Sequence, residues 1–360
     1  MAPAAHRGRL VVEGDAMEMN LEADLILGVE ESARQPAEDL IEQTTALARS
    51  RSLYSGNDGV PLLRDSFALY LDELGAKERI AVLTDNDLNE WIYLRDRFSD
   101  FLDDGDLKDR QRMLAFSDNI IVGAPLDLSQ EDGGLFQLIW GLAAYQANMA
   151  LHGRWVRGAI THGPLYMDDS VVTGQALVDA DAIEKKTAIF PRVVLGQDCF
   201  SFLISDYKSE ADPFTSTVNG YLLIDDRDKK FFINYLSALL EDEPWHVGSD
   251  VEALDRHREA VEAGFIANSK NFKVRNKMLW LVDYHNYFCD AGGFSPSLKI
   301  STNVVPRRRG RSFSPPVSRL TADEWIRLRQ RQEAKEFTQR KQRVINTLSI
   351  NRNFVTPHKF

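Results

Sequence analysis

The sequence predicts an α+β fold built on one antiparallel sheet with helices on one of its faces. Short apolar runs alternate with two long stretches in which apolar residues recur at helical spacing. Turns rich in glycine and aspartate separate these segments. The resulting order, β-α-β-β-α-β with further strands, is that of the split β-α-β, or ferredoxin-like, arrangement. We therefore expect a ferredoxin-like sheet domain that is extended by helical N- and C-terminal segments.

Each element of this order has its own local signal. Large side chains alternate at Phe67–Leu71, which predicts a strand, and Gly75 permits a sharp turn after it. Residues 84–105 and 134–153 predict helices, because each carries apolar residues at helical spacing. The apolar run 112–125 predicts a strand that continues, or returns, at its centre. Two strands around a glycine turn are expected within 155–169, and further strands at 170–177 and 191–196. A helix is expected at 176–190, closed before Pro191. A hairpin is expected at 220–236 with its turn at 226–229, and helices at 250–265 and 274–288.

The composition is typical of a globular protein without a membrane span. The 360 residues are 44% hydrophobic and 27% charged. The longest near-apolar run, 135–153, contains Gln137, Gln146 and Asn148, which predicts a packed helix and not a membrane helix. The two cysteines form no CxxC pair, which excludes a disulfide framework or a zinc-thiolate site. Because no apolar signal segment is visible at the start, we expect a cytoplasmic protein.

Charge and composition also suggest four segments and restrict the partners. A net charge of −11 argues against a general polyanion binder. The basic run 306–311 is either a nucleic-acid contact or a solvated linker, and its proline- and serine-rich surroundings favour the linker. We expect no nucleic-acid partner and no membrane partner. The expected segments are an N-terminal extension (1–63), a catalytic domain (64–245), a helical part of the same unit (246–300), and a basic linker with a C-terminal helix (301–360).

Two carboxylates stand at predicted strand ends, and no common catalytic motif accounts for them. The motifs GxxxxGK[ST], GxGxxG, HExxH and GxSxG are all absent. Asp72 closes the first strand, and Asp118 interrupts the run 112–125, where a purely structural strand would remain apolar. In a split β-α-β sheet these two ends meet at one edge, and two facing carboxylates repel unless a divalent cation lies between them. The pair either holds Mg²⁺ or Mn²⁺ with carbonyls of the Glu73 turn, or consists of two turn aspartates facing water.

Strand alternation adds an aromatic residue to this face of the sheet. Ala68, Tyr70 and Asp72 point to one face, and Leu69 and Leu71 point to the other. Tyr70 is therefore expected on the face that carries Asp72. There it either contacts a small base, or packs at the seam of a dimer.

Seven segments between roughly residues 64 and 290 have a recognisable order and spacing. They are ALYLDELG, MLAFSDNIIV and RGAITHG, followed by Gly174–Glu184, Ala188–Val193, Phe232–Leu236 and Lys277–Phe288. In this order the segments resemble the class III nucleotidyl cyclases and most closely the Pycsar pyrimidine cyclases of bacterial anti-phage defence.

The resemblance implies a homodimer with composite active sites that cyclises a nucleoside triphosphate, most often UTP, to the 3′,5′-cyclic nucleotide. Cyclic UMP would then act on a separate effector protein. The resemblance makes Asp72 and Asp118 the catalytic ligands of two divalent ions, Mn²⁺ or Mg²⁺, with the Glu73 backbone as a further ligand. It also makes Arg157 and Arg192 candidate substrate-binding residues. Arg154 and Lys230 are further candidate cations that we leave unranked.

Four positions depart from the adenylate-type members of class III. Leu114 and Val171 stand where those members carry a lysine and an aspartate that read a purine, which speaks against ATP. Val178 and Ala182 stand where the usual transition-state asparagine and arginine are found. Three alternatives therefore remain: a CTP cyclase, a purine cyclase despite the missing readers, or a catalytically silent cyclase-like module that binds a nucleotide or a partner protein.

Overall fold

The computed structural model describes residues 53–56, 58–102, 110–126, 134–199, 202, 220–240 and 249–301. The chain forms two units, Met1–Ser52 and Leu53–Phe360, and all described residues belong to the second. The expected N-terminal helix before residue 53 and the expected linker and C-terminal helix after residue 301 lie outside the described residues.

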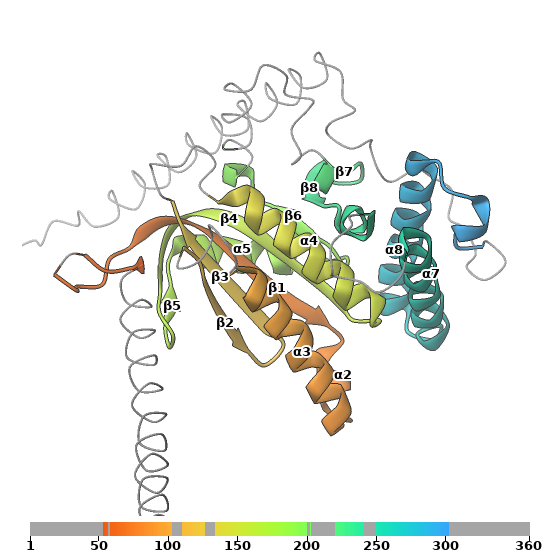
Figure 1. The fold of residues 1–360 in the computed structure, drawn as a ribbon, viewed down its shortest axis with the longest axis horizontal. Coiled ribbons are helices and arrows are strands. Elements are labelled where there is room, and N and C mark those ends of the chain that lie inside the picture. Colours follow the sequence, from red (N-terminus) through yellow and green to blue (C-terminus); the bar gives the residue numbers. More distant parts are fainter. Residues whose placement is uncertain are drawn as a thin grey trace, which may run out of the picture. The chain divides into compact units, whose positions relative to one another are not determined.

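The described chain alternates strands and helices (Figure 1). The strands are β1 (Arg64–Leu74), β2 (Arg112–Phe116), β3 (Asn119–Pro125), β4 (Trp155–Met167), β5 (Val172–Thr173), β6 (Val193–Leu195), β7 (Leu222–Asp225) and β8 (Lys230–Ile233). The helices are α2 (Ala76–Ile80), α3 (Asp85–Leu102), α4 (Leu135–Leu151), α5 (Gln175–Lys186), α7 (Asp250–Ala267) and α8 (Phe272–Gly292), with short 3₁₀ turns η3 (Tyr235–Leu240) and η4 (Pro296–Leu298).

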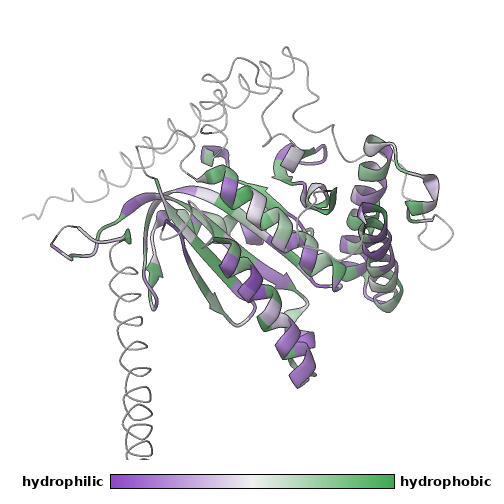
Figure 2. Cartoon of the chain, in the orientation of Figure 1, coloured by the Kyte–Doolittle hydropathy of each residue, from purple (hydrophilic) through white to green (hydrophobic). Residues whose placement is uncertain are grey.

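Seven of these strands form one sheet in the order β2-β3-β1-β4-β6-β8-β7, and β5 pairs with β4. Neighbouring strands are antiparallel except for β4 and β6, which are parallel. The predicted α+β class with a mainly antiparallel sheet is confirmed. β2 is the edge strand, and Figure 2 shows it as mostly hydrophobic.

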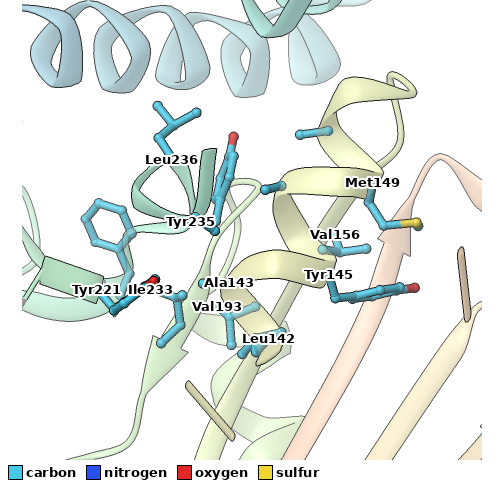
Figure 3. Packing of buried hydrophobic residues seen from close by; sticks show 14 of the residues in the cluster. Leu142, Ala143, Tyr145, Met149, Val156, Val193, Tyr221, Ile233, Tyr235 and Leu236 are labelled. Carbon is cyan, nitrogen blue, oxygen red and sulfur yellow. The ribbon is translucent and has the colours of Figure 1, made fainter. Parts of the chain in front are cut away.

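The main core lies between one face of the sheet and the helices α3 and α4, with α7, α8 and η3 completing it. We call this the core face. α4 buries most of its length here, because residues such as Leu142 and Ala143 pack on the strands while Tyr145 stacks on Phe98. In Figure 3, Tyr235 and Leu236 of η3 lie beside α4.

The opposite face of the sheet carries a smaller apolar cluster, and we call it the site face. Ala68 of β1, Ile121 of β3 and Leu165 of β4 pack there with Ala176 of α5. The prediction that helices occupy only one face is therefore wrong in this respect. α5 covers the site face because small residues on its inner side permit a close approach to β1 and β4.

Two further differences concern strand boundaries. The segment 155–169 was expected as two strands around a glycine turn, but β4 is one strand of 13 residues. Gly163, at φ 152°, lets it pass through this position without interruption. The helix predicted at 176–190 ends at Lys186, before the Pro191 that we expected to close it.

The helical pair α7 and α8 has well-formed ends. Ser249 and Glu252 form a reciprocal capping box at the start of α7, and Gly293 ends α8 in the left-handed conformation. None of the helices in the described segments combines the length and the apolar character needed to cross a membrane.

Candidate functional site

Three adjacent strands bring a row of polar side chains together on the site face. In the antiparallel register, Asp72 of β1 lies opposite Asn119 of β3 on one side and Arg157 of β4 on the other. Directly paired residues of antiparallel strands point to the same face. The row Asn119–Asp72–Arg157 therefore runs across the sheet at the end of β1.

Asp118 lies beside this row, in the turn between β2 and β3. The apolar run 112–125 is a hairpin, and Ser117 adopts the left-handed conformation, with φ 53°, that this tight turn requires. The expectation that Asp118 interrupts a strand is thus resolved in favour of a returning chain. The Asp118 carboxylate accepts hydrogen bonds from Ser117 Oγ (2.9 Å) and Asn119 Nδ2 (3.4 Å).

Glu73 joins the two carboxylate positions through its backbone. Its N–H donates to the Asp118 carbonyl over 3.2 Å. Because the N–H and C=O of one strand residue point to the same side, the Glu73 carbonyl also points toward the Asp118 turn. The Glu73 side chain is buried and forms ion pairs with Arg79 (3.0 Å) and Arg154 (3.2 Å). Burial raises the pKa of this carboxyl, and the two guanidinium groups oppose that shift.

Arg154 is therefore part of the scaffold and is not available to a substrate. It is buried, and its guanidinium contacts Glu73, the Asp87 carbonyl and Glu90. These contacts fix the start of α3 against the end of β1.

Arg157 is the cation that the structure places at the row. Its Nε lies 2.8 Å from Asp72 Oδ2, and its NH2 lies 2.5 Å from Glu184 Oε1. The side chains of Arg157 and Asp72 are 22% and 20% exposed, whereas that of Glu184 is 3% exposed. Arg157 therefore spans a solvent-accessible carboxylate and a buried one.

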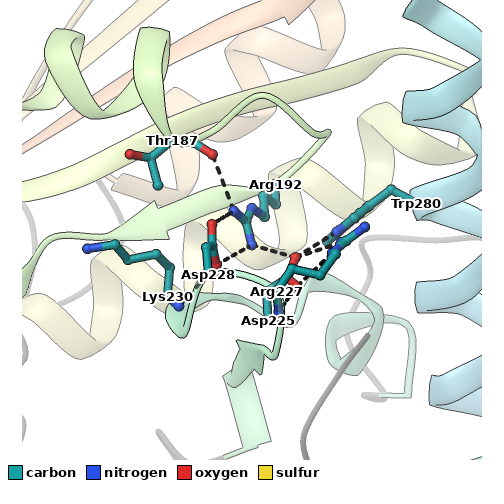
Figure 4. A network of polar contacts seen from close by, with 7 residues as sticks. All are labelled: Thr187, Arg192, Asp225, Arg227, Asp228, Lys230 and Trp280. Atoms are coloured by element: carbon teal, nitrogen blue, oxygen red, sulfur yellow. Dashed lines mark hydrogen bonds and ion pairs between the residues drawn. The ribbon is translucent and has the colours of Figure 1, made fainter. Parts of the chain in front are cut away.

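Arg192, the second predicted substrate-binding residue, is placed differently. Its side chain is 1% exposed and forms ion pairs with Asp225 and Asp228 of the β7–β8 hairpin. It also donates to the Thr187 carbonyl, and Trp280 donates to the same Asp225 (Figure 4). A clamp on a triphosphate is thus a wrong prediction for Arg192, because its donors hold the hairpin to the sheet.

Tyr70 lies on the site face, as its position in the strand predicted. Its hydroxyl donates to Asn119 Oδ1 over 2.6 Å. Burial raises the pKa of Tyr70 to about 12, and the negative charges of Asp72, Asp181, Glu184 and Asp118 act in the same direction. The phenol therefore stays neutral, within range of the charges of four carboxylates.

Leu114, one of the two positions that lack a purine reader, lies on the site face. Leu114 of β2 pairs with Ile121, which in turn pairs with Tyr70. The apolar row Leu114–Ile121–Tyr70 lies on the same face as the polar row, two residues away from it along β1 and β3. Val171, at the second missing purine reader, and Val178, at the position of the missing asparagine, are exposed apolar side chains.

Two residues of this cluster, Glu184 and Lys277, were not predicted. Ala176, Ala180 and Glu184 recur every fourth residue on the buried side of α5. A carboxylate at the third position of a small-residue stripe was a signal in the sequence, because a buried carboxylate needs a partner. Lys277 of α8 is half-buried; burial and the charge of Arg157 lower its pKa, while Asp72 and Glu184 oppose this. No sequence signal placed α8 beside the row.

The groove between α3, α4 and α7 is a separate feature. It is lined by Tyr93, Arg97, Asn148, His152 and Arg256, among others. No predicted site residue lines it.

Comparisons with known proteins give a limited result. No family model matches the sequence, and no curated protein is similar to it. Among solved structures, the chain is similar to the adenylyl cyclase CyaB from P. aeruginosa, with 13% identity and a TM-score of 0.33. The similar region covers 39% of this chain and 81% of that chain. The function of this chain has to be argued from its own residues.

The polar row has the donor types that a hard divalent cation prefers. Mg²⁺ and Mn²⁺ bind carboxylate and carbonyl oxygens, and Asp72, Asp118 and the Glu73 carbonyl supply these at adjacent strand ends. Within the described segments, no group of three or more His, Cys, Asp or Glu side chains could hold a metal ion. The two-carboxylate set fits an ion that the protein shares with a phosphate-bearing substrate.

Proposed function

We propose that this chain is a metal-dependent nucleotidyl cyclase that converts UTP to 3′,5′-cyclic UMP and pyrophosphate. The main support is the polar row on the site face. The row and the adjacent Asp118 bring two acidic side chains, Asp72 and Asp118, together with the cation Arg157 at the ends of adjacent strands. The order β1-α3-β2-β3-α4-β4, with β2-β3-β1-β4 adjacent in the sheet, supports the proposal, because a split β-α-β core has this order.

The reaction joins the ribose 3′-oxygen to the α-phosphorus and breaks the bond from that phosphorus to the bridging oxygen of pyrophosphate. The 3′-hydroxyl loses its proton to water. Two divalent ions, Mn²⁺ or Mg²⁺, would acidify the 3′-hydroxyl and neutralise charge on the phosphates. Asp72, Asp118 and the Glu73 carbonyl would hold these ions, and Arg157 would bind phosphate oxygens through its planar donors.

Base selection is proposed to depend on the apolar row next to the polar one. Tyr70, Ile121 and Leu114 present ring and aliphatic surface and no charged donor. A purine-reading lysine at Leu114 is missing, and the bulk of Tyr70 favours a one-ring base. UTP and CTP both satisfy these conditions, so a CTP cyclase is the nearest alternative.

The remaining parts of the proposal rest on the resemblance in the sequence. A homodimer would supply groups in place of Val178 and Ala182, and Phe116 on the edge strand, 47% exposed, is suited to such a contact. Cyclic UMP would serve as a second messenger for a separate effector in anti-phage defence.

A second candidate function is a silent cyclase-like module that binds a nucleotide without turning it over. Two observations favour it. Val178 is 59% exposed where a transition-state asparagine would be needed, and Arg157 pairs with the proposed metal ligand Asp72.

The test is incubation of the purified full chain with each of the four ribonucleoside triphosphates and Mn²⁺, with products separated by chromatography. We expect cyclic UMP from the wild type and a loss of at least about 100-fold in turnover for Asp118→Asn, because one ligand of the ions is removed. The matched control is Asp96→Asn, a change at an exposed residue of α3.

The outcomes separate the candidates. Cyclic AMP or cyclic GMP as the main product would contradict the base-selection argument. Nucleotide binding without any product would favour the silent module.

A further inference from the structure

Arg157 has an arrangement that suits an exchange of partners. It bridges Asp72 at 2.8 Å and Glu184 at 2.5 Å. The Asp72 end is open to solvent, with a side-chain exposure of 20%, whereas the Glu184 end is closed, at 3%. A ligand that arrives from solvent reaches the Asp72 end first.

Glu184 is held in a buried position on α5 as well as by its contact with Arg157. It continues the buried stripe of Ala176 and Ala180 on α5. A carboxylate in such a place is stable as an ion only beside a cation, and Arg157 is the cation that it contacts. Loss of this contact would leave Glu184 buried and unpaired, so Arg157 is held at this end.

Asp72, in contrast to the buried Glu184, is accessible to an ion from solvent. A divalent ion and a guanidinium group compete for the same carboxylate oxygens, because both require the negative charge of Asp72. Oδ2 of Asp72 is occupied by Arg157 in the structure. An ion bound to Asp118 and Asp72 would weaken or replace that contact.

We propose that Arg157 occupies Asp72 until a divalent ion takes its place, and that Glu184 is the positioning residue that keeps Arg157 in the site after this exchange. The proposal rests on the proposed metal-dependent function. Nε of Arg157, once released from Asp72, is free to meet the phosphate oxygens that arrive with the ion. By holding Arg157 in place, Glu184 makes the residue that was paired with the metal ligand Asp72 available to bind the triphosphate.

The exchange predicts an effect on metal binding without any nucleotide. Mn²⁺ affinity of the purified full chain is measured by electron paramagnetic resonance. Arg157→Gln is expected to bind Mn²⁺ about two- to fivefold more tightly than the wild type, the range that corresponds to a partly exposed ion pair. Arg157→Lys keeps the charge, but a single ammonium group does not reproduce a bridge made by two guanidinium nitrogens. This variant is also expected to bind Mn²⁺ more tightly than the wild type.

Lys185→Gln is the matched control for charge alone. Lys185 is an exposed residue of α5 that pairs with Asp181. Its replacement removes one positive charge near the same carboxylates and leaves Asp72 untouched, so we expect less than a twofold change. Equal tightening in Lys185→Gln, or unchanged or weaker binding in both Arg157 variants, would overturn the exchange.

Glu184→Gln tests the positioning role. At saturating Mn²⁺ we expect the KM for the triphosphate to rise about tenfold with a smaller change in kcat, because Arg157 is no longer held for ground-state binding. The same variant in an Arg157→Gln background is expected to have little further effect on KM. Additive effects of the two changes would contradict a role through Arg157.

These measurements distinguish the exchange from the proposed function. Tighter Mn²⁺ binding in the Arg157 variants, with no cyclic product from the wild type, would support the exchange and remove the cyclase. Failure of all variants to bind Mn²⁺ would overturn both.

Discussion

Three features of the structure determine the face, the direction and the protonation state of the Tyr70 side chain. Strand alternation sets its face and the hydrogen bond to Asn119 sets its direction. Burial, together with the adjacent acidic residues, raises its pKa and keeps its hydroxyl neutral. A neutral, oriented ring beside Asp72 acts on a ligand through its volume and its flat surface, not through charge.

At the residue scale, we predict that Tyr70→Ala shifts the ratio of kcat/KM for UTP over ATP toward ATP by about tenfold, because it opens space beside Leu114 and Ile121. Tyr70→Phe is the matched variant: it keeps the ring, loses the bond to Asn119, and is expected to keep the preference for a pyrimidine. Steady-state kinetics with both triphosphates provide the measurement. An unchanged ratio in Tyr70→Ala would mean that Tyr70 does not shape the base site.

At the element scale, the site depends on how closely β1 and β4 approach each other. Gly158 of β4 lies directly after Arg157 and pairs with Leu71. A Cβ atom at Gly158 would lie 2.0 Å from the Tyr70 carbonyl oxygen. Backbone cannot move aside as a flexible side chain can, so any side chain here would push the two strands apart at the polar row.

We therefore predict that Gly158→Ala lowers the free energy of unfolding by about 1–3 kcal/mol, as overpacking of a tight contact does. It should also reduce turnover, because Asp72 and Arg157 lose their register. The control is Gly220→Ala, since a Cβ there meets nothing within 4 Å, and we expect a change within about 0.5 kcal/mol. Urea unfolding of both variants supplies the comparison. Equal stability of the two variants would refute the close-approach argument.

At the element scale, the faces of the strands could be predicted from the sequence, but the positions of the helices could not. Asp72 and Tyr70 could be placed on one face because strand periodicity is local, and the register of β2 with β3 is set by the short hairpin at Ser117 and Asp118. Arg192 was misplaced because its partners, Asp225 and Asp228, lie more than 30 residues away in a separate hairpin. Glu184 and Lys277 were missed for a related reason. The face of the sheet that a helix covers is decided by long-range packing. The small-residue stripe of α5 therefore indicated that Glu184 is buried but not where it lies, and α8 carries no local signal for its position.

At the scale of the whole molecule, a buried histidine pair ties α7 and α8 to the rest of the core. His285 Nε2 lies 2.8 Å from the Leu298 carbonyl, which only accepts, so this nitrogen carries the proton. His285 Nδ1 then accepts from His257 Nδ1 at 3.0 Å, and His257 Nε2 accepts from the Tyr235 hydroxyl at 3.0 Å. This chain of bonds is complete only when both rings are neutral. A proton added to His285 Nδ1 would place two N–H groups face to face, and a proton added to His257 Nε2 would displace the Tyr235 hydroxyl as donor.

The pair therefore predicts that acid destabilises the protein well above the pH at which carboxylates titrate. Burial lowers the pKa of His285 to about 4 and that of His257 well below its usual value of 6.5. The unfolded chain takes up a proton at each ring near pH 6.5, but the folded chain does not, so the stability present above pH 6.5 is lost as the pH falls. Between pH 7.5 and 5.5 each ring contributes a loss of about 1.4 kcal/mol in the free energy of unfolding.

Urea unfolding at both pH values tests this prediction. His257→Gln removes one of the two titrating rings, so its loss between pH 7.5 and 5.5 should be smaller than that of the wild type by about 1.4 kcal/mol. His152→Gln, at an exposed position after α4, is the control and should show the wild-type loss. If His257→Gln instead loses as much stability as the wild type, the pair is not the source of the acid sensitivity. In that case the carboxyls of Glu73 and Glu184, whose pKa is raised, would not account for the loss. A raised carboxyl pKa makes the folded state bind the proton first and acts in the opposite direction.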